Sequence, residues 1–474
     1  MAALALFIIA SVCIAVADAT VMNVTIEPIN PGDELGSNFG QSIASFVYTE
    51  ANHCDEPSCE DEPKFFTTNT YFIGAPNYFL ASLQQAFGAV LILTCGGDPA
   101  SCSQGGYLLS PNPSGSYQFG SYVSATAPGG YIYVTESNFV NYGQVHVYNS
   151  DLSYAFSISP PVPQQFYIDY FGASHAFDQT PGQAAVVSGL GAILYGAPVG
   201  GVIGYVYDCS VPNCTALYAM APSLPQYLAA SSGPYAIEIA YPYVLTGMPY
   251  AGVLVWNLLT PSTCLSDSGD RPGICAPVNI IHAPPAATAS GLYFGSAIVF
   301  KNPILGIAAT ALDAIVSQNA SVVYLYNVES DLAAFKPKSA NTTLVPPASV
   351  RDRTDFLRFG GSFDLISPGY NSRYINRPGM PTASITGSFA VAVGAASLAA
   401  NDNGEVFWYV CPLNLGSAHC TYISSVTGDD YVFGSTVVLG SDFNSLTVFA
   451  LTTEATVPAV LLSDSKVNSL MTLG

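Results

Sequence analysis

The side chains that could act as a general base are few and lie far apart along the chain. The histidines share no motif, and there are five of them: His53, His146, His175, His282 and His419. A hydrolytic triad needs a nucleophile, a base and an orienting acid that converge in space, usually with a recognisable turn around the nucleophile. The sequence contains no G-x-S-x-G, H-E-x-x-H or phosphate-binding loop. His146 alternates with Val145 and Val147 in a β-type run, so we expect a surface position or a satisfied core position. We expect His419, beside Cys420, to face solvent.

Paired carboxylates, which glycosidases use, would have to be brought together by the fold. Asp and Glu number 32, and the candidates are scattered along the chain: Asp169, Asp178, Glu238, Asp313, Asp355, Asp364 and Glu405. We therefore expect no catalytic residue, no cofactor and no enzyme. A glycoside hydrolase or lyase is the alternative.

One loop is strongly acidic. Five carboxylates lie within eight residues, around a pair of cysteines: Asp55, Glu56, Glu60, Asp61 and Glu62. Such a group could hold a hard cation such as calcium, which takes oxygen ligands. The spacing matches no known cation loop, so we expect a solvated acidic loop and no metal site, with calcium as the alternative.

The cysteines fall into close pairs. Without Cys13, which lies in the N-terminal leader, ten remain: Cys54/Cys59, Cys95/Cys102, Cys209/Cys214, Cys264/Cys275 and Cys411/Cys420. No pair has the two-residue spacing of a zinc knuckle, so local disulfides formed in an oxidising compartment fit better. Four pairs directly follow a β-type run, so we expect each to pin the hairpin between the third and fourth strands of a repeat.

The N-terminus and the sequons indicate secretion. Residues 1–19 resemble a signal peptide, with an apolar segment from Leu4 to Val16 and the cleavage site Ala17-Asp18-Ala19. Acceptor patterns for N-glycosylation occur at Asn23, Asn213, Asn319 and Asn341. We expect a secreted glycoprotein. Because no membrane or lipid anchor follows the last strands, we expect attachment to a cell surface to need a partner or self-association.

Composition favours many short strands and excludes some partners. The chain has 474 residues, of which 50% are apolar and only 9% are charged, and its net charge is −21. An acidic surface repels phosphate backbones, so we expect no nucleic-acid partner. Beyond residue 19, Gly, Pro, Asn and Ser interrupt every apolar run well short of the ~20 residues needed to cross a bilayer, so we expect no direct membrane insertion. Short Val-, Ile-, Tyr- and Phe-rich runs between turns indicate strands.

The chain repeats itself. A Phe-Gly-like pair opens each copy, at 39–40, 119–120, 171–172, 232–233 (Ser-Gly), 294–295, 359–360 and 433–434. A glycine-punctuated second strand follows, and then a third strand of the type Gly-x-Val-x-Val-Tyr. In the clearest copies the second strand carries Ile73-Gly74-Ala75-Pro76 or Tyr195-Gly196-Ala197-Pro198. Small residues suit inner strands that converge on an axis, because they let backbones approach one another.

This pattern resembles the FG-GAP repeat of the integrin α-subunit type of β-propeller. The resemblance implies an all-β fold, a seven-bladed β-propeller of four-stranded antiparallel blades, with one domain over residues 20–474 that serves extracellular recognition. The calcium loop common in that family, with its alternating aspartates, is missing here.

Ring closure could use the N-terminal segment. Residues 20–31 contain an isolated β-type run that could pair with the last repeat near Pro458–Leu462 and hide two strand edges. The same strand could instead enter a neighbouring molecule and build an oligomer or filament. We expect the intramolecular pairing.

The expected function is structural or adhesive recognition, or self-assembly, through a protein or glycan ligand. A carbohydrate-binding, lectin-like propeller is the alternative. Tyrosine clusters at 167–170 and 241–250 could form an aromatic recognition face or could simply pack the outer strands.

Overall fold

The computed structural model describes residues 20–463, with gaps. The description omits 26–31, 35–38, 41, 52–64, 83, 96–101, 112–117, 126–129, 138–142, 162–170, 173–174, 178–183, 193–201, 210–213, 221–235, 249–251, 259–263, 266–272, 286, 288–292, 311–320, 329–330, 338, 348–356, 367–387, 398–402, 416–418, 429–433, 442–445 and 451–457. The acidic loop, Cys54 and Cys59 therefore lie outside the described residues.

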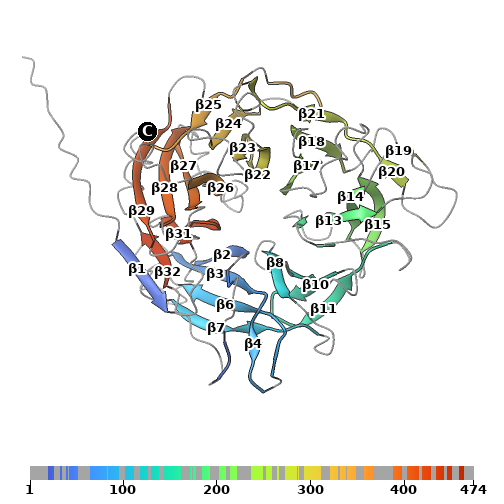
Figure 1. Ribbon diagram of the computed structural model, residues 1–474, viewed down its shortest axis with the longest axis vertical. Coiled ribbons are helices and arrows are strands. Elements are labelled where there is room, and N and C mark those ends of the chain that lie inside the picture. The colour runs from blue at the N-terminus through green and yellow to red at the C-terminus, as the bar shows by residue number, and fades with distance from the viewer. Residues whose placement is uncertain are drawn as a thin grey trace, which may run out of the picture.

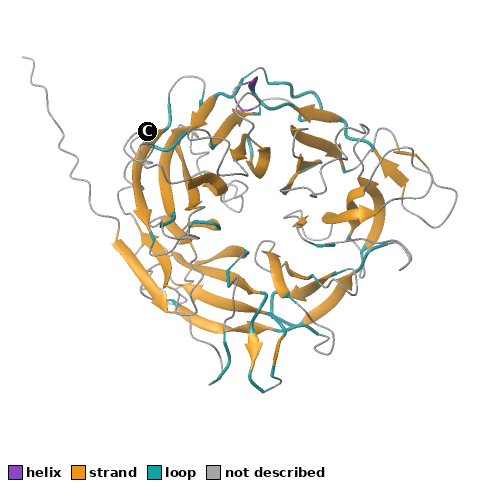
Figure 2. Ribbon diagram, viewed as in Figure 1, coloured by secondary structure: helices purple, strands orange, loops and turns teal. Residues whose placement is uncertain are grey.

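The described strands form antiparallel sheets that follow one another in chain order around a common axis, as in a β-propeller (Figures 1 and 2). Five sheets are four-stranded. They comprise β2 (Ile43–Ala51), β3 (Phe65–Ala75), β6 (Ala89–Cys95) and β7 (Ser103–Leu108); β8 (Phe119–Ala125), β9 (Tyr131–Glu136), β10 (Gln144–Asn149) and β11 (Tyr154–Ile158); β16 (Ile237–Ala240), β17 (Tyr243–Met248), β18 (Gly252–Asn257) and β21 (Asn279–Ile281); β22 (Tyr293–Lys301), β23 (Ile304–Thr310), β24 (Val322–Asn327) and β25 (Thr342–Leu344); and β26 (Leu357–Ile366), β27 (Ser388–Ser397), β28 (Glu405–Pro412) and β29 (Thr421–Thr427). A short hairpin, β4 (Phe79–Leu80) and β5 (Gln85–Ala86), projects from the first sheet's second-to-third connection.

The number of four-stranded blades is five among the described residues, whereas the sequence predicted seven. In the third repeat, a six-stranded sheet combines β12 (His175–Phe177), β13 (Ala184–Ala192), β14 (Val202–Asp208) and β15 (Thr215–Met220) with the hairpin β19 (Cys264–Leu265) and β20 (Gly273–Cys275). The last repeat is divided into two two-stranded sheets, one of β30 (Val437–Ser441) and β31 (Leu446–Ala450), the other of β1 (Thr20–Thr25) and β32 (Pro458–Ser463).

One predicted strand is misplaced. The second strand of the third repeat is β13, which pairs with β14 through Ser188 opposite Gly204. The literal Gly-Ala-Pro of residues 196–198 lies after β13, outside the described residues. The segment Ala184–Ala192 has the same mixture of small and β-branched residues, so it satisfies an inner strand equally well.

The repeated Phe-Gly pair has a clear structural role. All six described glycines of these pairs have a positive φ, between 72° at Gly40 and 95° at Gly295, a region that favours glycine. The described phenylalanines that precede them are at most 3% exposed. Each pair therefore turns the chain into a blade while its ring fills the core.

The second-strand glycines let neighbouring blades approach each other. A Cβ built on Gly74 would overlap the carbonyl oxygen of Gly120 in the next blade, and one on Gly247 would overlap that of Gly295. The same overlap occurs between Gly394 and the carbonyl oxygen of Gly434. The expected close approach of inner strands is thus made by one glycine from each of two adjacent blades.

The N-terminal strand pairs within its own chain. β1 runs antiparallel to β32, with Thr20 opposite Ser463 and Thr25 opposite Pro458 (Figure 1). This is the intramolecular pairing expected from the sequence. It pairs the first and the last of the described strands.

Disulfides pin the outer hairpins. The bonds Cys95–Cys102, Cys209–Cys214 and Cys411–Cys420 each connect the end of a third strand to the start of a fourth strand, as predicted. Cys275 is also disulfide-bonded and lies opposite Cys264 in the β19–β20 pair. That hairpin lies in the connection between the third strand, β18, and the fourth strand, β21, of its sheet, as predicted; it also pairs in parallel with β15 of the neighbouring sheet and covers its edge.

The outer strands carry irregularities. In four sheets the pairing of the third with the fourth strand shifts by one residue, which leaves an extra residue on the fourth strand: Gly105, Ala155, Leu217 or Ile423. Such bulges twist an edge and disfavour its pairing with another chain.

Candidate functional site

Most of the sequence-predicted candidates do not come together in the described part of the molecule. His282 and His419 are exposed, which agrees with the expectation for His419. His53, Asp169, Asp178, Asp313 and Asp355 lie outside the described residues. Two groups of polar residues do converge, one around His146 in the second blade and one around Glu238 and Asp364 near the axis.

His146 is the centre of a chain of five hydrogen-bonded side chains, which we call the histidine chain: Ser110, Glu136, His146, Ser157 and Tyr154. His146 Nε2 lies 2.7 Å from Glu136 Oε2, and its Nδ1 lies 2.7 Å from Ser157 Oγ. Ser110 donates to the same Glu136 oxygen at 2.8 Å, and the Tyr154 hydroxyl lies 2.8 Å from Ser157 Oγ. The chain therefore runs from the interior between the first two blades to the outer strand β11.

Burial changes steeply along the histidine chain. His146 is 1% exposed, Glu136 8% and Ser110 7%, whereas Ser157 is half-buried and Tyr154 is 46% exposed. The imidazole is also held by rings, with the centroid of Phe119 at 5.7 Å and that of Tyr154 at 6.4 Å. A buried acid and base thus lead to a hydroxyl that solvent can reach.

The bonding partners decide the tautomer of His146. An ionised carboxylate can only accept, so Nε2 must carry a proton where it meets Glu136. In the neutral imidazole Nδ1 is then an acceptor, and Ser157 donates its hydroxyl proton to it. Tyr154 in turn donates to Ser157 Oγ. This pattern matches a nucleophile, a base and an orienting acid, all within hydrogen-bond reach.

His146 occupies a position that other blades fill with an aromatic ring. The Phe-Gly phenylalanine of the third repeat packs on Tyr205, that of the fifth on Tyr324 and that of the sixth on Phe407, as Phe119 packs on His146. In the sheet of the sixth repeat, β26–β29, Tyr422 and Ser425 repeat the Tyr154–Ser157 pair, at 3.0 Å, opposite Phe407. Of the two serines, Ser157 lies against a base, His146, whereas Ser425 lies against Phe407.

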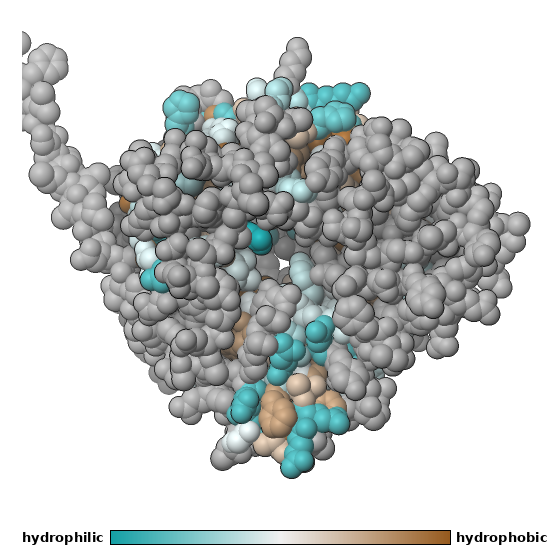
Figure 3. Space-filling model, viewed as in Figure 1, coloured by the Kyte–Doolittle hydropathy of each residue, from teal (hydrophilic) through white to brown (hydrophobic). Residues whose placement is uncertain are grey.

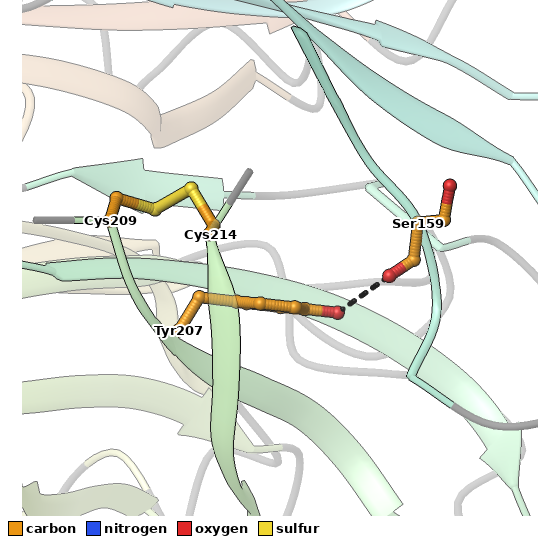
Figure 4. The surroundings of a disulfide bond; sticks show 4 residues. All are labelled: Ser159, Tyr207, Cys209 and Cys214. Carbon is orange, nitrogen blue, oxygen red and sulfur yellow. Dashed lines mark hydrogen bonds between the residues drawn. A yellow bond between two sulfur atoms is a disulfide. The ribbon is translucent and has the colours of Figure 1, made fainter. Parts of the chain in front are cut away.

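Tyrosines two residues further along the third strand link adjacent blades. The hydroxyls of Tyr148, Tyr207 and Tyr409 donate to the carbonyl oxygens of Leu109, Ser159 and Val345, at 2.8, 3.1 and 2.8 Å. Each acceptor directly follows the fourth strand of the preceding blade. Figure 4 shows the bond from Tyr207 to Ser159 next to the Cys209–Cys214 disulfide. These tyrosines support the expectation that many aromatic side chains pack the outer strands.

Carboxylates also bridge innermost strands. Glu238 on β16 accepts from the backbone N–H of Phe300 on β22 at 3.3 Å, and Asp364 on β26 accepts from that of Leu439 on β30 at 3.0 Å. The two acids occupy equivalent positions in their blades. Each lies opposite a residue of the second strand, and that residue is two positions before the glycine that approaches the next blade, Gly247 or Gly394. Figure 3 shows a narrow opening at the centre of the disc, partly bordered by hydrophilic atoms.

The electrostatics of this axial pair are dominated by burial. Desolvation raises the pKa of Glu238 to about 7, although Lys301 and the Phe300 amide oppose the shift and Asp364 adds to it. Desolvation likewise raises the pKa of Asp364, again against the effect of Lys301. Glu238 and Asp364 thus act as inter-blade acceptors that share one nearby cation, and Glu405, the third described candidate, is buried elsewhere, on β28.

Three further features of the described residues bear on binding. Within the described ranges no three His, Cys, Asp or Glu side chains are grouped to hold a metal ion. No helix in the described part of the chain has both the length and the apolarity to cross a bilayer. Four large apolar or aromatic side chains among those described are markedly exposed: Tyr154, Leu217, Tyr241 and Tyr422.

Comparison with known proteins gives a structural likeness alone. No family model matches the chain, and no curated protein matches it. Among solved structures, 306 chains match. One is the crystal structure of the computationally designed Ika8 protein, which is 10% identical, with 91% of this chain and 100% of that chain covered and a TM-score of 0.41.

Proposed function

We propose that this chain is a secreted recognition protein that presents a single closed disc to a protein or glycan ligand. The observation that carries the proposal is that exposed strand edges of the disc are paired, bulged or covered. β1 pairs with β32 of its own chain, four outer strands carry an extra residue, and β15 is covered by the β19–β20 hairpin. A disc with protected edges suits binding through its faces and rim better than strand-to-strand assembly.

The secreted location is supported by several independent features. Three local disulfides and the absence of a bilayer-spanning helix among the described residues are compatible with an extracellular protein. Asn341, one of the sequon asparagines, is exposed at the start of β25. Glycosylation there and at Asn23, Asn213 and Asn319 is part of the proposal.

We further propose that the ring has seven blades, as the FG-GAP resemblance implies. The sheet of β12–β15 would be a blade with a hairpin added at its edge, and β30–β31 would form another with β32 and β1. One bond supports β30 as an inner strand: Ser362 accepts from the backbone N–H of Val437, as Ser42 accepts from that of Val123 between the first two blades. Val438 also packs against the core of the first sheet.

Imaging separates the two main uses of such a disc. We expect negative-stain images of the natively secreted protein to show single discs, and size exclusion to give a monomer. Filaments or chains of discs would overturn the proposal in favour of structural assembly. A variant that lacks residues 20–31 is the matched control, because it removes β1, the strand that a filament would exchange, without altering the exposed tyrosines.

A lectin is the second candidate, favoured by the exposed Tyr154, Tyr241 and Tyr422, because tyrosine offers a flat apolar body with a polar tip. A glycan array with the secreted protein tests it. Binding that is lost in Tyr241→Ala would support the lectin, and an array without signal, beside capture of a defined extracellular protein, would favour protein recognition.

A further inference from the structure

We propose that Ser157 is an activated nucleophile that reacts with carboxylic esters and related acyl electrophiles, with His146 as its base and Glu136 as the positioning acid. This inference goes beyond recognition and does not depend on it. It rests on the histidine chain, in which two successive distances of 2.7 Å join the serine to the base and the base to the acid.

The histidine chain has three properties that activate a serine. The base has an acceptor nitrogen directed at the hydroxyl, because the carboxylate holds the proton on the other nitrogen. The base cannot turn away, since it is 1% exposed and packed between Phe119 and Tyr154. The nucleophile itself lies on the outer strand β11 and is half-buried, so an electrophile can approach it from solvent.

The acid is held as firmly as the base. Glu136 Oε2 accepts both the His146 proton and the hydroxyl of Ser110, which follows the last strand of the first blade. Two hydrogen bonds to one oxygen thus fix the position of the carboxylate. A purely structural replacement for an aromatic ring would not need a carboxylate shared between two blades and directed at the imidazole.

The proposed reaction needs only the side chains of the histidine chain, the ester and water. Ser157 Oγ attacks the carbonyl carbon of an ester, and its proton passes to Nδ1 of His146. The carbon–oxygen bond to the alcohol breaks, and the alkoxide takes that proton as it leaves. Water then attacks the acyl-serine with the same base, which releases the acid and restores the hydroxyl.

The molecule contains its own control. In the sheet of the sixth repeat, β26–β29, Ser425 bonds to Tyr422 as Ser157 does to Tyr154, and each serine pairs with the equivalent residue of the third strand, but Ser425 lies opposite Phe407 instead of a histidine. Ser157 and Ser425 are therefore matched outer-strand serines, and the difference between them is the histidine that faces Ser157.

The test uses the full-length secreted protein and a fluorophosphonate probe, which loses fluoride as a serine oxygen bonds to its phosphorus. Chymotryptic peptides are then analysed by mass spectrometry, and the labelling rates of the two serines are compared within one sample. Because general-base assistance contributes about 10²–10⁴-fold, we expect Ser157 to be labelled at least about 100-fold faster than Ser425. Rates within about threefold of each other would overturn the proposal.

Variants test the assigned roles. We expect Ser157→Ala to abolish the adduct, His146→Phe, which copies the sixth blade, to slow it at least about 100-fold, and Glu136→Gln to slow it by an intermediate factor. Ser425→Ala should leave the rate unchanged. An adduct on Ser157 that forms equally fast in His146→Phe would refute the role of the base, and the comparison of the two serines in the unmodified protein stands even where a variant fails to fold.

Discussion

The close approach of adjacent blades predicts a specific response to a single methyl group. Gly295 has a φ of 95°, and a Cβ on it would lie 2.8 Å from the Cα of Gly247 in the preceding blade. Carbon atoms prefer about 3.5–4.0 Å, so one of the two backbones would have to move by roughly 1 Å. Overpacking of this kind costs about 1–3 kcal/mol, and a positive φ costs an L-residue about 1–2 kcal/mol more. We expect Gly295→Ala to lose about 2–5 kcal/mol in total.

The matched control is Gly32→Ala. Gly32 has a φ of 91°, and its added Cβ would meet only the Ala81 side chain, at 3.4 Å. It should therefore lose the conformational part alone, about 1–2 kcal/mol. Gly105→Ala, at 3.5 Å from its nearest neighbour and without a positive φ, should be nearly neutral.

Thermal melting of the secreted protein, with its disulfides intact, measures these differences. With an unfolding entropy of about 2.1 cal/mol/K per residue over roughly 450 residues, each kcal/mol shifts Tm by about 1 °C. We expect Tm to fall by about 2–5 °C in Gly295→Ala and by about 1–2 °C in Gly32→Ala. If the two variants melted at the same temperature, the close approach of the glycines would not be a determinant of stability.

Four other perturbations follow from the contacts described above. Tyr207→Phe removes the bond to the Ser159 carbonyl and should cost about 1 kcal/mol by denaturant unfolding, whereas Tyr205→Phe, whose buried hydroxyl has no hydrogen-bond partner, should cost nothing; equal losses would contradict this reading. Replacing Cys209 and Cys214 together by serine should cost about 2 kcal/mol, from the loop-closure entropy of a short loop, and should speed hydrogen exchange in β14 and β15 but not in β10. Because the folded-state pKa of Glu238 is raised to about 7 from 4.5, the folded state binds the extra proton, so stability falls as pH rises between these values; Glu238→Gln should flatten that fall in Tm measured from pH 4.5 to 7.5, and an unchanged slope would refute the assignment. Deleting residues 20–31 uncovers β32 and should lower Tm while the protein stays monomeric; an unchanged Tm would show that β1 does not seal the ring.

The repeats could be predicted from the sequence because their determinants are local. Glycine at the Phe-Gly turns reports a positive φ, and small residues between β-branched ones report an inner strand. The same locality misled the interpretation of the third repeat, where two neighbouring segments satisfy the pattern and β13 uses the first of them. It also hid the hairpin β19–β20, since nothing in its residues says that it pairs with the neighbouring sheet.

The histidine chain could not be predicted, because register creates it. The pairing of β10 with β11 begins at their hairpin with Tyr148 opposite Tyr154. If that register continued without a bulge, Phe156 would lie opposite His146. The extra residue Ala155 shifts the strand by one, so that Ser157 faces the imidazole instead. Glu136 joins them from β9, and Ser110 from the segment after β7. The sequence left open whether His146 lies on the surface or in the core; it lies in the core, and its partners were not predicted.

The pairing of β1 with β32 also decides how the ring would respond to mechanical load. Thr20 and Ser463 lie opposite each other, so the chain enters one strand and leaves the other at the same end of the pair. Tension applied to the segments outside these residues would act across the ladder and break its hydrogen bonds one after another, as a zipper opens, because those bonds lie perpendicular to the strands. A disc tethered by both ends would therefore open at this seam under low force while its disulfide-pinned hairpins stayed folded.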